Sequence, residues 1–178
     1  MSASPLILSP SHVASPHPAR KAWVAVIFSL IFICFTSTSF MGGHHTQIWL
    51  TDVWQAVLGT WRLDLTGPVN EACRKVGHFV GYGMIGLLFR HAWHTSIRAG
   101  LMRIGASLAT IQGMVSVSAL SVLSTFLVAS LDELHQRFVP GRVSSFRDVM
   151  VDTVGAIVLN VVFWTVRAHR RSQALNAR

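Results

Sequence analysis

The chain has 178 residues, of which 51% are hydrophobic and only 12% are charged. Soluble domains carry about 25% charged residues, and the mean hydropathy of +0.48 agrees with this deficit. The composition therefore excludes an ordinary soluble domain and favours an integral membrane protein.

The formal net charge is +8. In a soluble protein such a charge would indicate a nucleic-acid partner. Here most of the basic residues flank apolar runs, so contact with anionic lipid headgroups is the better interpretation, and no nucleic-acid partner is predicted. Cys34 lies inside an apolar run and Cys73 in a connection, so a disulfide between them is not expected.

The first apolar run extends from Ala22 to Phe40 and contains no charged residue. It is long enough to cross a bilayer. A cleaved signal peptide is the rival interpretation, but its apolar core would normally be shorter and no A-x-A cleavage site follows. An uncleaved membrane helix is therefore favoured, preceded by residues 1–20 as a flexible tail rich in Ser, Pro and Ala.

The connection that follows carries apolar residues spaced by three and four positions: Trp49, Leu50, Val53, Trp54, Val57, Leu58, Trp61 and Leu65. This spacing places the apolar side chains on one helical face. Because tryptophan prefers the headgroup level, the segment is expected to be a short amphipathic helix on the membrane surface. A helix packed on its own protein fits equally well. Thr66-Gly67-Pro68 predicts the end of this helix.

The second crossing is expected from Glu71 to Trp93, although its fully apolar part, Phe79–Phe89, is short. Lys75, His78 and Tyr82 are spaced by three and four residues, so they share one face. The same segment contains small residues that are expected to allow another helix to approach closely. These are Gly77, Gly81, Gly83 and Gly86.

A third, uncharged crossing is expected over Ile104–Leu131, after a loop from Arg90 to Arg103, and a fourth over Asp148–Val166. The predicted fold class is an all-α polytopic membrane protein. It has four transmembrane helices and a short interfacial amphipathic helix in the first outward connection. Residues 21–170 would form the membrane domain, followed by a flexible basic tail, 171–178.

The positive-inside rule predicts the orientation. The N-terminal flank, the loop after the second crossing and the C-terminal tail would be cytoplasmic. The protein would therefore be a multi-pass protein of the cytoplasmic membrane with both termini in the cytoplasm. Opposing this orientation, the two segments expected outside, 41–75 and 132–147, each carry three basic residues.

Polar residues from three separate helix ends are expected to meet on the outward side. Asp148 and Asp152 are four residues apart and so share a face. Charged groups inside a membrane are costly and usually find partners, and Arg142 and Lys75 are the expected partners of Asp152. The full candidate ligand-binding cluster is Lys75, His78, Tyr82, Asp132, Glu133, Gln136, Arg142, Asp148 and Asp152.

Simpler interpretations exist for single members of this cluster. Asp148 fits a helix cap, and His78 alone fits a packed, satisfied histidine. Carboxylate and imidazole are also competent metal ligands, but no HExxH or comparable spacing is present. Neither a metal nor a cofactor is therefore predicted. The residues with suitable ligand atoms in this region are His78, Asp132, Glu133, His135 and Asp152.

The order and spacing of these residues resemble the VanZ family of membrane proteins, named for a member linked to teicoplanin resistance. The family pattern resembles K-x-x-H-F-x-x-Y, then D-E-x-x-Q-x-F-x-P-x-R, then D-x-x-x-N/D-x-x-G. It covers residues 71–165, plus a first helix that matches in position only, and the 41–70 connection is not part of it. Asp152 stands where asparagine is frequent. The matching residues are Lys75, His78, Phe79 and Tyr82, then Asp132, Glu133, Gln136, Phe138, Pro140 and Arg142, then Asp148, Asp152 and Gly155.

The resemblance implies a small helical protein of the cytoplasmic membrane, associated with resistance to lipid-tailed glycopeptides. It implies no particular reaction. The first functional hypothesis is an outward polar pocket that binds an amphiphile, either such a glycopeptide or a lipid-linked envelope component. The second is an intramembrane enzyme acting on a lipid-linked substrate, with Glu133 or His78 as general base and Arg142 stabilising negative charge. The third is a structural subunit whose charge network only locks helix packing.

Overall fold

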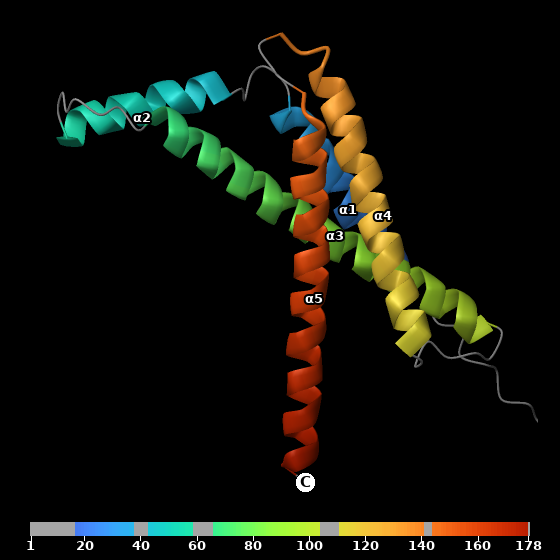
Figure 1. The fold of residues 1–178 in the computed structure, drawn as a ribbon. Helices are drawn as coiled ribbons and strands as arrows, with labels where there is room; N and C mark the ends of the chain where they lie inside the picture. The colour runs from blue at the N-terminus through green and yellow to red at the C-terminus, as the bar shows by residue number, and fades with distance from the viewer. Residues whose placement is uncertain (1–16, 38–42, 59–65, 104–110, 141–143, 178) are drawn as a thin grey trace, which may run out of the picture.

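The computed structural model describes residues 17–37, 43–58, 66–103, 111–140 and 144–177, and this part of the chain contains helices and no strands (Figure 1). The prediction of an all-α fold is therefore confirmed. The five helices are α1 (His17–Thr36), α2 (Gly43–Leu58), α3 (Thr66–Arg103), α4 (Ile111–Gln136) and α5 (Phe146–Asn176).

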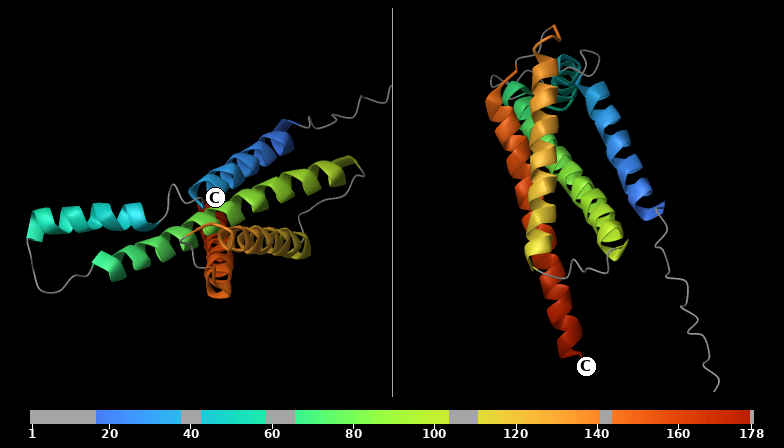
Figure 2. Two further views of the ribbon diagram at one scale, coloured as in Figure 1. Left: turned by 90° about the horizontal axis from the view of Figure 1, so that it is seen from above. Right: turned by 90° about the vertical axis from the view of Figure 1, so that its right-hand side faces the viewer.

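The long helix α3 is the centre of the molecule, because it packs against each of the other four helices. The remaining large contact is between α4 and α5. The first residue of α1 and the last of α5 lie at the same end of the bundle (Figure 2). We call this the basic end, and we call the opposite end, where α4 finishes and α5 begins, the acidic end.

Three helical segments of the described chain are long and apolar enough to cross a membrane: Pro18–Thr36, Val115–Gln136 and Phe146–Asn176. Large apolar side chains cover their outer faces, as at Phe32, which is 67% exposed. Extensive exposed apolar surface of this kind is typical of helices that contact lipid. Helix α3 is not among the three, since charged and histidine residues flank its short apolar part.

Helix α1 is held against α3 by small side chains and a tryptophan. Ala22 and Val26 are buried in this contact. The Trp23 ring meets the Trp93 ring edge to face at a centroid distance of 5.2 Å, and its Nε1 donates a hydrogen bond of 3.0 Å to Ser96 Oγ. Edge-to-face aromatic pairs and a satisfied indole N–H fix the position of one helix along the other.

Glycines allow α3 and α5 to approach closely. A Cβ atom added to Gly155 would collide with the carbonyl group of Phe79, and one added to Gly86 would lie 2.9 Å from Ala156 Cβ. The expected role in close packing thus applies to Gly83 and Gly86. It is wrong for Gly77 and Gly81, because a Cβ at either position would meet no atom within 4 Å.

Several helix boundaries differ from the predicted ones. The predicted loop Arg90–Arg103 is the last part of α3, and Thr66-Gly67-Pro68 begins α3. Proline is compatible with a helical first turn because the N–H groups there have no intrahelical acceptor. Residues 59–65, the end of the predicted interfacial helix, and residues 104–110, the start of the predicted third crossing, lie outside the described chain. Helices α1 and α5 extend into segments expected to be tails.

Candidate functional site: a buried polar cluster beside an apolar groove

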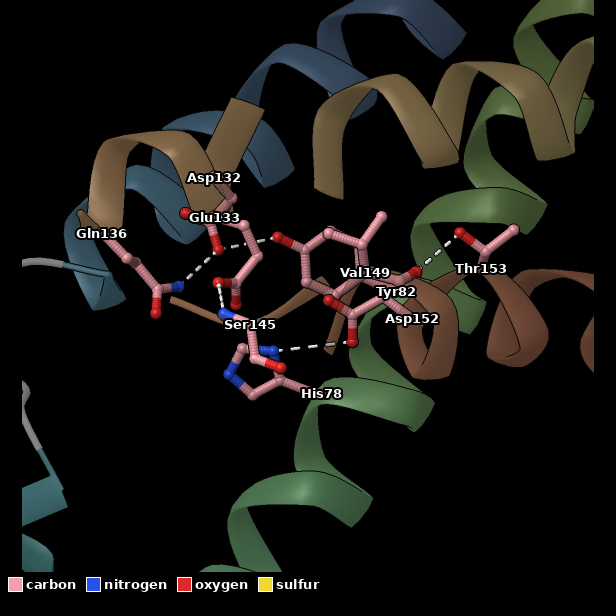
Figure 3. A network of polar contacts seen from close by, with 9 residues as sticks. All are labelled: His78, Tyr82, Asp132, Glu133, Gln136, Ser145, Val149, Asp152 and Thr153. Atoms are coloured by element: carbon pink, nitrogen blue, oxygen red, sulfur yellow. Dashed lines mark hydrogen bonds and ion pairs between the residues drawn. The ribbon is translucent and has the colours of Figure 1, made fainter. Parts of the chain in front are cut away.

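Asp132, near the end of α4, accepts two hydrogen bonds inside the bundle (Figure 3). The hydroxyl of Tyr82 on α3 donates to Asp132 Oδ2 at 2.9 Å, and Nε2 of Gln136 donates to the same oxygen at 2.9 Å. All three side chains are buried. The four-residue spacing of Asp132 and Gln136 brings them together on one face of α4, and Tyr82 reaches them from α3.

Asp152 on α5 faces His78 on α3 (Figure 3). Asp152 is 1% exposed. Its Oδ1 lies 3.5 Å from His78 Nδ1, and neither atom makes a hydrogen bond within the described chain. The distance is that of an ion pair with poor hydrogen-bond geometry. The imidazole also stacks on the ring of Tyr82, with centroids 5.9 Å apart.

Glu133 joins α4 to the beginning of α5. Its Oε2 accepts a 2.8 Å hydrogen bond from the backbone N–H of Ser145. Ser145 is the N-cap of α5, has an extended backbone, and accepts a hydrogen bond from the N–H of Arg147 through its side chain. The 5% exposed Glu133 carboxylate thus fixes the residue from which α5 starts.

Asp148 and Lys75, two further residues of the predicted cluster, take no part in these hydrogen bonds. Asp148 lies in the first turn of α5 and is half-buried beside the cluster. Lys75 is exposed and forms a 2.6 Å ion pair with Glu71, one turn earlier on α3. The prediction that Lys75 pairs with Asp152 is therefore wrong, because the imidazole of His78 occupies that position. Arg142, the other expected partner, lies outside the described residues.

A small cavity lies between the three helix ends. Its volume is about 10 Å³, close to the minimum that holds one water molecule. This cavity is too small for an organic ligand, so the polar cluster alone does not form a binding pocket. Its lining consists of Arg74, Lys75, His78, Glu133, Gln136, Asp148, Val151 and Asp152.

A much larger groove runs between α1 and α3. Its volume is about 720 Å³, within the range of ligand sites. Apolar residues such as Phe28 and Leu88 line one part of it, and His78, Tyr82 and Asp132 close the other. Gly77 and Gly81 form part of the floor, where their missing side chains leave the space open. His78 borders both the groove and the small cavity.

The sequence interpretation did not include Arg74 or this groove. Arg74 borders both the groove and the small cavity. It stands four residues before His78 and eight before Tyr82, and this helical spacing could have identified it. The groove carried no such signal, because it depends on how far α1 stands from α3.

Among the described residues, no three histidine, cysteine or acidic side chains are grouped so that they could hold a metal ion. The cluster offers hydrogen-bond acceptors, one imidazole and one guanidinium, next to an apolar surface. Chemically, this arrangement can recognise a polar headgroup or exchange a proton with it.

Comparison with known proteins gives a family but no close relative: no curated protein and no solved structure matches the chain. The model of the VanZ/LLP1 family matches residues 7–167, which include every residue of the polar cluster and both walls of the groove. The chain therefore belongs to the VanZ/LLP1 family.

Proposed function

We propose that the protein is a four-span protein of the cytoplasmic membrane, with α3 as the remaining crossing and both termini in the cytoplasm. Helix α3 lies among the three apolar helices and packs against all of them. No acidic residue occurs before residue 52, between residues 72 and 131, or after residue 152. The N-terminal flank, the segment from Arg90 to Arg103 and the segment after Val166 carry nine of the 15 lysine and arginine residues, and the positive-inside rule, which counts basic residues, assigns the basic end to the cytoplasm. Helix α2 would lie on the outer surface.

Cysteine labelling tests this orientation. In a chain with Cys34 and Cys73 replaced by alanine, Ser144→Cys reports on the acidic end and Ser172→Cys, at an exposed site on α5, on the basic end. A membrane-impermeant maleimide added to intact cells is expected to label only Ser144→Cys. Labelling of Ser172→Cys alone would reverse the orientation.

The function that the site supports best is binding of an amphiphile in the groove between α1 and α3. The observation that carries it is that one continuous groove has an apolar part and ends on a buried polar cluster. From Arg74 to Leu88 the groove follows about 21 Å of helix, more than half of a bilayer core of about 30 Å. A lipid tail would lie along Phe28 and Leu88, with its headgroup near Arg74 and His78.

The ligand class follows from this shape and from the family. A lipid-tailed glycopeptide of the teicoplanin type or a lipid-linked envelope component has the required long tail and polar head. Arg74 would meet an anionic group, and Asp132 would orient Tyr82 or accept a hydrogen bond from the head. Any resistance would follow from binding of the antibiotic or its target in the outer leaflet.

Filling the groove tests the proposal without disturbing packing. Gly81→Leu would place a side chain in open space of the groove, whereas Gly100→Leu adds the same side chain to an exposed, open position elsewhere on α3. Native mass spectrometry of detergent-purified protein is expected to find a co-purifying amphiphile in the wild type and in Gly100→Leu. Gly81→Leu is expected to lose it.

Equal retention in both glycine variants would contradict binding in the groove. A second measurement uses cells exposed to a lipid-tailed glycopeptide. If this member confers resistance through the groove, Gly81→Leu reduces it at unchanged protein abundance. Asp132→Asn tests the polar end, since it weakens the acceptor of the Tyr82 hydroxyl.

A second candidate function is general-base catalysis on a lipid-linked substrate. The specific observation in its favour is that a buried carboxylate, Asp152, stands at Nδ1 of His78, which leaves Nε2 on the far side of the ring. An acid behind an imidazole orients it and stabilises its protonated form. His78 also borders the groove.

This alternative is tested with purified protein and envelope lipid extract. Catalysis predicts turnover with a pH dependence that His78→Gln abolishes, while Gly100→Leu leaves it intact. Binding without catalysis predicts retention of the amphiphile with no chemical change, and absence of turnover with any envelope lipid would reject the enzyme.

A further inference from the structure

Arg90 is a cation buried in the protein at a distance from the polar cluster. It lies on α3, two turns beyond Tyr82, and is 6% exposed. Its Nη1 donates to Ser118 Oγ on α4 at 2.6 Å and to Asn160 Oδ1 on α5 at 3.4 Å. Neutral groups of two other helices therefore hold the guanidinium in place.

Aromatic rings complete this arrangement. The guanidinium carbon lies 4.4 Å from the ring centroid of Phe163 and 4.7 Å from that of Trp164. Trp164 donates through Nε1 to Ser118 Oγ at 3.1 Å, so it is itself fixed. Asn160 is fixed as well, because its Nδ2 donates to Ala156 O at 2.9 Å. The orientation of Arg90 is thus set before any ligand arrives.

Within the described residues, Arg90 has no ion pair and no acidic side chain acts on it electrostatically. Arg90 belongs to the segment between residues 72 and 131, and Asn160 to the segment after residue 152, and neither segment contains an acidic residue. The one neighbouring charge that acts on Arg90 in the described part of the chain is positive, that of Arg167. A buried charge without a counter-charge is expensive, and a neighbouring cation increases that cost.

We propose that Arg90, together with Arg167, forms a site for the phosphate group of an anionic lipid at the basic end of the bundle. A guanidinium offers planar N–H donors that match phosphate oxygens, and both hydrogen bonds described above use Nη1 alone. The phosphate supplies the missing negative charge. Arg90 contacts α4 and α5, whereas the groove lies between α1 and α3, so the site holds or fails independently of amphiphile binding in the groove.

The test measures lipid retention by native mass spectrometry after the full-length protein is incubated with phosphatidylglycerol or phosphatidylcholine. The wild type is expected to retain phosphatidylglycerol preferentially. Arg167→Gln, at an exposed position, is expected to weaken this retention about tenfold, the effect of losing one charge-assisted hydrogen bond. Arg90→Met is expected to abolish the preference.

Arg171→Gln is the matched control, because it removes the same charge one turn further along α5 at another exposed position. It is expected to retain phosphatidylglycerol as the wild type does. Inorganic phosphate identifies the source of the anion: competition at millimolar concentration would assign a free phosphate, and no competition assigns the lipid.

Two results would overturn the site. Equal loss in Arg167→Gln and Arg171→Gln would show general attraction to a basic surface. Unchanged preference in both Arg167→Gln and Arg90→Met would show that neither cation binds the phosphate. If Arg90→Met does not fold, Arg90→Lys replaces it. Lysine keeps the positive charge but lacks the planar guanidinium, so this variant is expected to fold and to retain phosphatidylglycerol more weakly.

Discussion

Asp152 Oδ1 and His78 Nδ1 face each other at 3.5 Å between α5 and α3, and neither atom has a hydrogen bond elsewhere in the described chain. The contact exists because α5 crosses α3 closely at Gly155, one turn further along α5, where a Cβ would collide with Phe79. Close packing of two backbones thus places an acid against an imidazole beside a cavity of about one water molecule. The pair is held by helix packing rather than by a flexible loop.

Asp152→Ala should destabilise the protein. The substitution leaves His78 Nδ1 buried without its nearest partner and opens space in the interface, and loss of such a partner costs about 1–3 kcal/mol. The measurement is the thermal unfolding temperature in detergent, where a decrease of several degrees is expected.

Asp148→Ala is the control for Asp152→Ala, because Asp148 is half-buried on the same helix one turn earlier. Asp148→Ala is expected to lower the unfolding temperature less than Asp152→Ala does. The unfolding temperature of Asp152→Asn should fall between those of the wild type and Asp152→Ala, because the amide keeps the shape of the side chain. Equal unfolding temperatures for Asp152→Ala and the wild type would show that the pair contributes nothing to stability.

The two hydrogen bonds to Asp132 should be coupled. Tyr82→Phe and Gln136→Leu each remove one donor to Asp132 Oδ2, and each is expected to cost about 1 kcal/mol. The double variant leaves the buried carboxylate without either donor, so its loss should exceed the sum of the single losses. A thermal-unfolding double-mutant cycle measures this coupling, and strict additivity would argue against a shared network.

Helical spacing correctly predicted which residues share a helical face. His78 and Tyr82 share a face of α3, and their rings are stacked. Asp148 and Asp152 border the same small cavity. Spacing could not decide between Arg74 and Lys75, which are four and three residues from His78. Both residues border the small cavity, but only Arg74 also borders the groove, whereas Lys75 pairs with Glu71.

The features that sequence reasoning missed depend on how helices are placed against one another. Four glycines on α3 suggested one packing surface, yet Gly83 meets Leu159 of α5 whereas Gly81 borders an open groove. The environment of Arg90 combines groups of α3, α4 and α5. The sequence places Arg90 at the end of the predicted second crossing and at the start of the predicted loop, and neither position predicts its contacts with α4 and α5.

Glu133→Leu should loosen the connection between α4 and α5. The substitution removes the acceptor of the Ser145 N–H, which lies directly before the first turn of α5. Limited proteolysis between Gln136 and Ser145 is expected to become faster, because local opening no longer has to break this hydrogen bond. Leu134→Ala, at an exposed neighbouring position, provides a control that keeps the acceptor. An unchanged cleavage rate in Glu133→Leu would contradict the role of Glu133 in holding this connection.

Two glycine-to-alanine substitutions should have opposite effects. Gly155→Ala forces a methyl group into the carbonyl of Phe79, which either separates α5 from α3 or distorts one of them. Such overpacking costs about 1–3 kcal/mol or more. Gly81→Ala adds the same methyl group in open space, so the higher helix propensity of alanine should stabilise α3 by up to about 1 kcal/mol.

Unfolding temperature and membrane abundance measure this difference. Gly155→Ala is expected to lower both, and Gly81→Ala to keep or raise them. Because the interface at Gly155 also positions Asp152, Gly155→Ala should lose any activity that depends on the His78 pair even in the fraction that remains folded. A Gly155→Ala protein as stable as Gly81→Ala would mean that α3 and α5 do not pack at this distance, and the His78–Asp152 contact would no longer be supported.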